Sequence, residues 1–145
     1  MKKLIILLLL IMPLSACEKI KDTILNKLEA QIPESSTAQN EKAEQLYHAV
    51  IQRDMGNIYT LVGPNIRVEL DQKPDVLKAV FEILPNYEAE NPSIVMTTKA
   101  IELPLGKVTK IGYKYDYPNQ PILFSVVYKG HEGGDEIVGF WVQPL

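Results

Sequence analysis

The residues best suited to bind a metal ion lie close together near the carboxyl end of the chain. His131, Glu132, Asp135 and Glu136 place one imidazole and three carboxylates within six residues, a donor set that divalent cations accept. Their spacing matches neither an EF-hand nor a zinc motif, and the glycines at 133 and 134 are typical of a solvated hairpin loop. We therefore expect a polar loop here, and we expect no metal and no cofactor.

A second group of residues could take part in acid–base catalysis. His48 lies at the edge of an apolar helix stripe, and no serine, cysteine or second histidine follows it at a catalytic spacing. A general base needs an oriented partner and a matched pKa, and the sequence around His48 supplies neither. The acids Asp54, Glu102 and Asp116 are expected at a helix end, a strand end and a solvated strand face. We predict no catalytic residue, and an enzyme stays open as an alternative.

The amino-terminal segment has the composition of a secretory signal peptide. Two lysines follow Met1, and Leu4–Met12 is an unbroken run of nine apolar residues. A membrane-spanning helix needs about 20 apolar residues, so this run is too short for one. We expect residues 1–16 to be removed as a signal peptide.

The end of this segment, Leu14-Ser15-Ala16-Cys17, resembles the lipobox of bacterial lipoproteins. The resemblance implies that Cys17 is acylated, for example with palmitate, becomes the new amino terminus and attaches the protein to the membrane. Cys17 is the only cysteine, which excludes an internal disulfide and a thiolate site in the mature domain. Glu18 in place of aspartate implies, by analogy with the sorting rule of these lipoproteins, the outer membrane facing the periplasm.

Length and charge set limits on the remaining chain. With 145 residues, 46% of them hydrophobic, the sequence has room for one ordinary globular domain. Without Lys2 and Lys3, thirteen basic residues stand against eighteen acidic ones, a formal charge of −5. An acidic chain of this kind is a poor nucleic-acid binder, so we expect no nucleic-acid partner.

Residues 17–40 are expected to tether the anchor to the domain. Five apolar side chains recur at helical spacing within residues 18–32, which indicates a short amphipathic helix. It could lie on the lipid surface, dock on the domain or a partner, or be a loosely helical tether. Pro33–Gln39 is predicted to be a flexible linker, so the domain is expected to span residues 41–145.

The first half of this domain shows helical periodicity. Asn40 is predicted to cap a helix whose apolar residues recur between Ala43 and Ile51, and Asn57 a second, short helix that ends at Gly63-Pro64. Residues 66–70 alternate between apolar and charged, which predicts a short strand. Pro74 begins a third helix, which Pro85 ends.

The second half alternates with the period of strands. We expect strands over residues 94–100 and 109–117, the latter with one wet face. Residues 122–128 and 137–142 are apolar on both faces and are predicted to be interior strands or strands covered twice. This order gives an α+β fold in which amino-terminal helices pack on a curved, four- to five-stranded antiparallel sheet.

The order of elements over residues 41–145 resembles the cone-shaped NTF2-like, or cystatin-like, superfamily. The resemblance is carried by the opening amphipathic helix, the break at Gly56-Asn57, and the two closing apolar strands around Phe124 and Phe140. Some NTF2-like domains are isomerases or dehydratases with acid–base groups in the mouth of the cone. No such pair can be located in this sequence.

Aromatic residues are the remaining candidates for a binding site. Most are expected in the core, Trp141 among them, but Tyr113, Tyr115 and Tyr117 share one strand face and carry three hydroxyls that a dry core would have to satisfy. They either line a site for a ligand or partner on the concave face, or pack under the helices. The sequence thus predicts a non-catalytic, lipid-anchored envelope protein that binds a small ligand or another envelope protein. The alternatives are an NTF2-like enzyme and a structural assembly accessory.

Overall fold

The computed structural model describes residues 34–145, and the predictions for the leader, Cys17 and the amphipathic segment 18–32 lie outside these residues. None of the helices in the described range has the length and apolar character needed to cross a bilayer. Four helices precede four strands: α2 (Thr37–Ile51), α3 (Met55–Leu61), α4 (Pro64–Gln72), α5 (Val76–Ile83), β1 (Ser93–Glu102), β2 (Gly106–Tyr115), β3 (Ile122–Lys129) and β4 (Ile137–Pro144).

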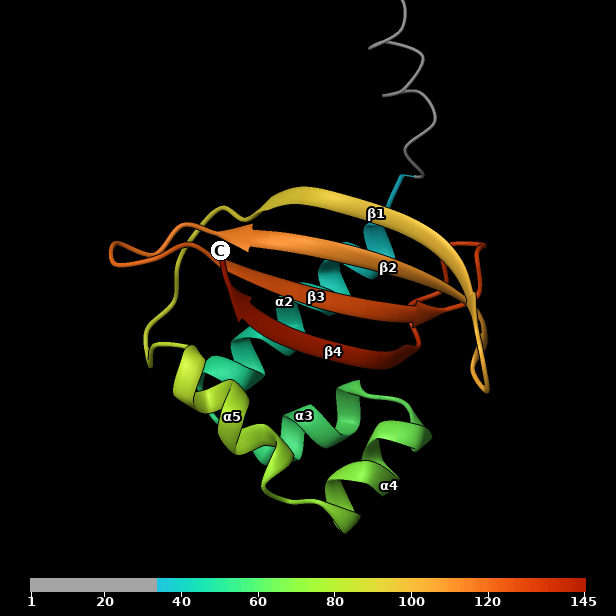
Figure 1. Ribbon diagram of the computed structural model, residues 1–145, viewed down its shortest axis with the longest axis horizontal. Helices are drawn as coiled ribbons and strands as arrows, with labels where there is room; N and C mark the ends of the chain where they lie inside the picture. The colour runs from blue at the N-terminus through green and yellow to red at the C-terminus, as the bar shows by residue number, and fades with distance from the viewer. Residues whose placement is uncertain (1–33) are drawn as a thin grey trace, which may run out of the picture. The chain divides into compact units, whose positions relative to one another are not determined.

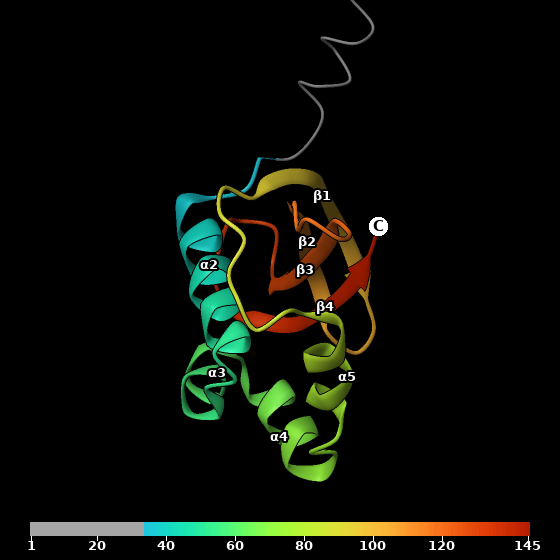
Figure 2. The same cartoon turned by 90° about the vertical axis from the view of Figure 1, so that its left-hand side faces the viewer.

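The strands form one antiparallel sheet in the order β1-β2-β3-β4, in which each strand pairs with its neighbour in sequence. The helices lie on one side of this curved sheet, with α2 running across it and α4 and α5 gathered beside β4 (Figure 1, Figure 2). The α+β class, the antiparallel meander and the helix-covered face are therefore confirmed. The sheet has four strands in the described chain.

The core lies between α2 and the helix-facing side of β2 and β3. Phe124 and Val126 of β3 are fully buried, as are Leu46 and Val50 of α2. Phe124 also packs edge-on against the rings of Tyr47 and Tyr115. Such a filled interior is held mainly by apolar burial, at about 1.5–3 kcal/mol for each fully buried large side chain.

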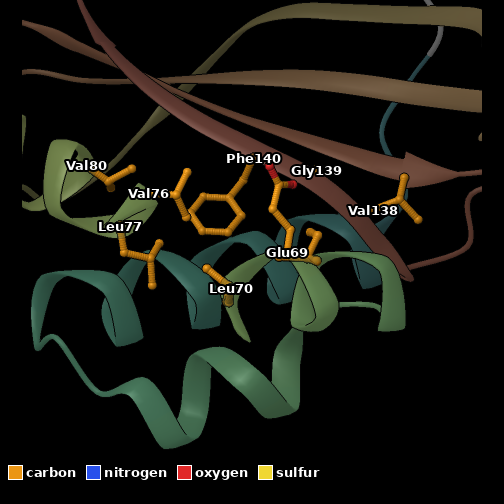
Figure 3. Close-up of a pocket in the computed structure, with 9 residues that line it drawn as sticks. Glu69, Leu70, Val76, Leu77, Val80, Val138, Gly139 and Phe140 are labelled. Atoms are coloured by element: carbon orange, nitrogen blue, oxygen red, sulfur yellow. The ribbon is translucent and has the colours of Figure 1, made fainter. Parts of the chain in front are cut away.

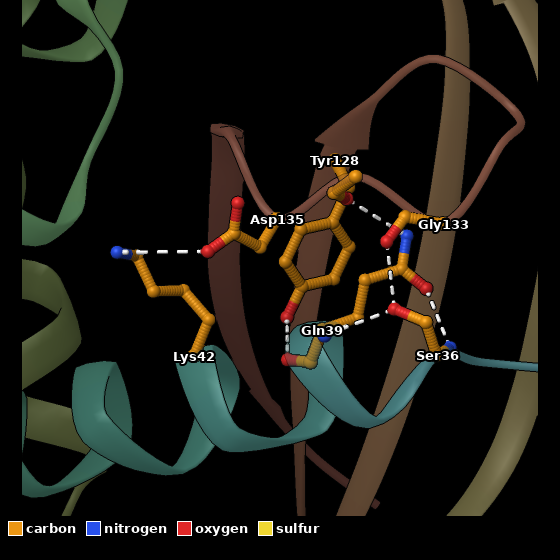
Figure 4. Close-up of polar contacts among 7 residues, drawn as sticks. Ser36, Gln39, Lys42, Tyr128, Gly133 and Asp135 are labelled. Carbon is orange, nitrogen blue, oxygen red and sulfur yellow. Dashed lines mark hydrogen bonds and ion pairs between the residues drawn. The ribbon is translucent and has the colours of Figure 1, made fainter.

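Helix α2 begins earlier than the sequence predicts. Its N-cap is Ser36 and not Asn40, and a capping box joins Ser36 to Gln39: the Ser36 hydroxyl accepts from the Gln39 amide, and the Gln39 side chain accepts from the Ser36 amide (Figure 4). Gln39 is 1% exposed, so the predicted flexible linker over residues 33–39 is wrong at its carboxyl end. Long-range hydrogen bonds from this turn, described below, give it a fixed place that local composition does not reveal.

The predicted strand over residues 66–70 is wrong, because these residues belong to α4. Pro64 occupies the first turn, where its missing amide hydrogen costs nothing. Ile66 and Leu70 are buried one helical turn apart, whereas Val68 is 53% exposed. The spacing of four residues between Ile66 and Leu70 is that of a helix. Exposed Val68, halfway between them, made the sequence look like the alternation of a strand. In α3 likewise, the side chain that caps the helix is Asp54 and not Asn57.

Strand β3 is interior, as predicted, but β4 is an edge strand. Its free edge is bound by the segment between α3 and α4: Val62 forms a bridge with Ile137, and the Gly63 amide donates to the Ile137 carbonyl at 2.7 Å. A Cβ at Gly63 would lie 2.7 Å from that carbonyl, so only glycine permits the approach. Trp141 of β4 is 36% exposed on the face away from the helices, which corrects its expected burial.

Candidate functional site

The three tyrosines singled out in the sequence are buried in the core under the helices, but β2 ends at Tyr115, so Tyr117 lies two residues beyond the predicted strand. Tyr113, Tyr115 and Tyr117 are 4%, 2% and 5% exposed. The Tyr113 hydroxyl donates to Oδ1 of Asn40 at 2.9 Å, and the Tyr117 hydroxyl donates to the carbonyl of Tyr87 at 3.2 Å. Packing under the helices therefore accounts for the bodies of all three rings, and internal partners satisfy two of the hydroxyls.

Tyr47 of α2 connects this row to the loop between α5 and β1. Its ring stacks on Tyr115 with centroids 3.8 Å apart. Its hydroxyl shares a short hydrogen bond with that of Tyr117 and accepts from the Ala89 amide at 3.0 Å. Burial raises the pKa of Tyr47 above its ordinary value, so the hydroxyl keeps its proton further into the alkaline range than an exposed tyrosine does. These contacts hold the loop against the open end of the tyrosine row.

A pocket of about 230 Å³ opens where that loop passes α2. Its wall includes the rings of Tyr47 and Tyr115, and His48 lies at its side. Nδ1 of His48 lies 2.8 Å from Oε1 of Glu88, and Nε2 lies 3.7 Å from Oε1 of Glu44. The His48 and Glu88 side chains are both 41% exposed, so the pair faces solvent across the pocket.

The chemistry of this pocket is that of an acidic, aromatic-walled recess. Glu44, Glu88 and Glu90 bring three carboxylates to its lining, against one imidazole. Carboxylates attract ammonium and guanidinium groups, whereas Tyr47 and Tyr115, which are 1% and 2% exposed and stacked on one another, contribute only apolar lining. The arrangement is therefore suited to a cationic group of a ligand or of a partner side chain.

Sequence reasoning missed Glu88, and it was wrong that His48 lacks an oriented partner. The two residues are forty positions apart, and Glu88 lies in an irregular loop where periodicity gives no information. One signal was available: the segment 85–92 begins and ends with proline and holds two glutamates and a tyrosine. Prolines at both ends of a short polar segment indicate a restrained loop, which can present side chains at fixed positions.

A second pocket is apolar and lies between α4, α5 and β4 (Figure 3). Leu70, Leu77, Val80 and Phe140 line it, and the Glu69 carboxylate reaches over its edge towards the strand. Its volume is about 110 Å³, less than half that of the recess beside His48, and within residues 34–145 Glu69 is the one charged residue that lines it. We regard it as a packing gap between short helices.

A third pocket lies on the other side of the Tyr47–Tyr117 contact. It measures about 320 Å³ and is lined by Tyr87, Tyr117, Ile83 and Pro144, among others. Tyr87 and Tyr117 meet there edge to face, with centroids 5.5 Å apart. No histidine lines this pocket, and it offers fewer charged groups than the one beside His48.

In the described chain, the side chains of the acidic loop near the carboxyl end are not grouped as metal ligands. Nε2 of His131 lies 2.9 Å from the Ala100 carbonyl, Glu132 accepts from the His131 amide, Asp135 pairs with Lys42 and Glu136 with Lys129. These side chains thus have separate partners. Among residues 34–145, no group of three His, Cys, Asp or Glu side chains is arranged to hold a metal ion.

The other acids named from the sequence also have structural partners. Asp54 caps α3, Glu102 pairs with Lys110 of β2, and Asp116 lies 2.8 Å from Nζ of Lys114. None of them lines the pocket beside His48.

Comparison of the chain with protein-family models, with curated proteins and with solved structures finds no match. The candidate site therefore stands on its geometry.

Proposed function

We propose that this protein is a lipid-anchored protein of the bacterial cell envelope that binds, without catalysis, a small ligand or an envelope partner through a cationic group. The binding site is the recess beside His48. The observation that carries the binding proposal is the convergence of Glu44 and Glu88 on one imidazole beside the stacked rings of Tyr47 and Tyr115. The anchor is proposed from Leu14-Ser15-Ala16-Cys17, with the outer membrane facing the periplasm as its location.

We also propose a finer class for the α+β fold, the NTF2-like cone. The order of helices followed by an antiparallel meander supports it. Tyr113 and Phe124 fill the space between sheet and helices, where enzymes of this fold would need acid–base groups. A filled interior with a charged recess at its rim favours binding over catalysis.

The two histidines of the chain allow a direct binding test by NMR. Ethylammonium and methylguanidinium are titrated into the mature chain in detergent micelles, and acetate serves as the probe of opposite charge. We expect the His48 ring signals to move saturably with the cations, and those of His131 to stay in place. Equal movement of both histidines, or movement with acetate alone, contradicts the proposed site.

Matched glutamine variants sharpen this test, because each histidine lies beside a glutamate. Glu88→Gln removes the carboxylate 2.8 Å from His48 and should weaken binding of the cations about tenfold, as loss of one charge-assisted contact does. Glu132→Gln removes the carboxylate that accepts from the His131 amide and should leave binding unchanged. If both variants bind the cations like the unmodified chain, the recess is not the site.

The anchor is tested separately by mass spectrometry of the chain from its native host. We expect Cys17 to be the amino terminus and to carry diacylglyceryl, and Cys17→Ser to release the protein from membranes or leave it unprocessed. An unmodified Cys17, or cleavage at another position, contradicts this part of the proposal.

An acid–base enzyme is the second candidate, and the His48–Glu88 pair favours it. A carboxylate 2.8 Å from Nδ1 fixes the imidazole, and Nε2 is then the nitrogen available to a bound molecule. Recovery of a bound natural ligand, chemically unchanged after incubation with the protein, decides for binding. Conversion that is lost in His48→Ala decides for the enzyme.

A further inference from the structure

The tip of the β1–β2 hairpin exposes two large apolar side chains, Ile101 near the end of β1 and Leu103 in the turn. Leu103 is 92% exposed and Ile101 is 73% exposed, the highest values among the large hydrophobic residues of the described chain. Removing such a side chain from water contributes about 1.5–3 kcal/mol. Removing these two side chains from water would therefore contribute free energy that the folded domain does not use.

The fold uses the rest of this turn but not these two residues. Leu105 packs against the cluster of Val108, Val127 and Val138 on the face away from the helices. Gly106 adopts a φ of +81°, which closes the turn in a conformation that favours glycine. The turn is thus fixed at its base, and Ile101 and Leu103 project from a supported position.

The chain enters the described domain at the same end of the sheet. The Ser36 hydroxyl donates to the Gly133 carbonyl at 2.7 Å (Figure 4), and this β3–β4 loop in turn reaches the hairpin through His131, whose Nε2 lies 2.9 Å from the Ala100 carbonyl. The Gly130 amide also donates to the Lys107 carbonyl at 2.7 Å. In Figure 1 the start of α2, the β3–β4 loop and the β1–β2 turn all lie at the right-hand end.

The chain preceding the domain is long enough to bring this end to the membrane. From Cys17 to Glu34 the backbone spans at most about 60 Å when fully extended. An anchor on such a tether keeps the domain near the bilayer at a high effective concentration, so even a small apolar contact is populated.

We propose that the tip of the β1–β2 hairpin inserts Ile101 and Leu103 into the interface of the membrane that carries the Cys17 anchor. This inference rests on the proposed lipid anchor. Lys99 and Lys107 flank the apolar pair and are exposed, so their ammonium groups can remain among lipid headgroups. The acidic loop at the same end offsets these charges, so the contact is apolar in origin and should persist at high salt.

A dye placed at position 103 tests this contact in the lipidated chain. Acylation occupies the only native thiol, so Leu103→Cys gives a single labelling site for an environment-sensitive dye. The matched control is Asn119→Cys, in the β2–β3 turn at the opposite end of the sheet. Both proteins are reconstituted into vesicles of phosphatidylethanolamine and phosphatidylglycerol, with or without lipids that carry a quencher near the headgroup.

We expect a blue shift and loss of fluorescence for the dye at position 103, unchanged by salt, and neither effect at position 119. Adding Ile101→Asp to the Leu103→Cys protein should reduce the quenching, which separates apolar insertion from mere proximity of the tether. Flotation with vesicles measures membrane attachment by the anchor independently. A protein that floats but shows equal quenching at both positions overturns the insertion and leaves the anchor standing, whereas one that does not float overturns the anchor.

Discussion

The two ends of the tyrosine row use the same residue type differently. At the end near the start of α2, Tyr113 donates to Oδ1 of Asn40, and Tyr128 of the neighbouring strand β3 donates to the carbonyl of Gln39, so both side chains serve the fold. At the other end, Tyr115 at the end of β2 and Tyr117 just beyond it are buried as well, but each lines a recess. Tyr113 thus serves only the core, whereas Tyr115 and Tyr117 also form pocket walls.

This difference shows that residues on the same face of one strand cannot be assigned to a site as a group. Tyr113 and Tyr115 are two residues apart and equally buried, but only Tyr115 borders the recess beside His48. The helix α2 covers both tyrosines, through Asn40 at Tyr113 and through Tyr47 at Tyr115, but only beside Tyr115 does it meet the loop after α5, and the recess lies between the two. The tyrosine site proposed from sequence accordingly narrows to Tyr115 and its neighbour Tyr47.

The largest effect is expected from alkaline pH, which acts on the buried tyrosines at both ends. Burial raises the pKa of Tyr113 to about 12 and those of Tyr115 and Tyr128 further. The folded chain keeps protons that the unfolded chain loses, so stability is constant below about pH 10 and then falls by about 1.4 kcal/mol per pH unit for each such tyrosine. Urea unfolding across this range, with tyrosinate absorbance as a second readout, checks it; a flat stability profile contradicts it.

Tyr128→Phe should cause the next largest loss, at the closed end. The Tyr128 hydroxyl is buried and donates to the Gln39 carbonyl at 2.6 Å, and its removal leaves that oxygen without this partner. We expect a decrease of about 1–2 kcal/mol in the free energy of unfolding. Chemical denaturation measures it, and an unchanged midpoint would show that the closed end does not depend on this contact.

Tyr113→Phe tests the same end with a smaller expected loss of about 0.5–1 kcal/mol. Its acceptor, the Asn40 side chain, is only partly buried and can bind water when the hydroxyl is gone. Cation binding beside His48 should not change. A loss of binding in this variant would mean that the two ends are not independent.

Tyr115→Phe should affect stability least, by less than about 0.5 kcal/mol, because the stack on Tyr47 is kept. Since Tyr115 forms part of the recess, we expect weaker binding of ethylammonium, by about fivefold. The His48 NMR titration measures it, with Tyr113→Phe as the matched control. Equal binding by both variants would remove the hydroxyl of Tyr115 from the site.

Much of the fold could be predicted because its signals are local and periodic. The apolar stripe of α2 and the alternation in β2 each specify an element without reference to the rest of the chain. Where one pattern fits two periods, the sequence predicted the wrong element. Ile66, Val68 and Leu70 alternate as in a strand, but Ile66 and Leu70 also have the spacing of one helical turn that α4 uses.

The candidate site could not be predicted, because it depends on contacts between distant segments. His48 was visible in the sequence, but its partner Glu88 comes from a loop placed by the hydrogen bonds of Tyr47 and Tyr117. The exposure of Trp141 has a similar cause: an apolar pattern on both faces did not reveal that β4 ends the sheet.

The capping box of α2 also has a mechanical consequence. The side chains of Ser36 and Gln39 donate to the carbonyls of Gly133 and Gly134. Tension on the chain at Glu34 therefore acts on these two long-range hydrogen bonds before it can unwind the helix. The load then passes through the β3–β4 loop into β3, an interior strand of the sheet. Force applied through the preceding chain is therefore carried by the sheet and not by the first turn of α2, because helix ends fray easily.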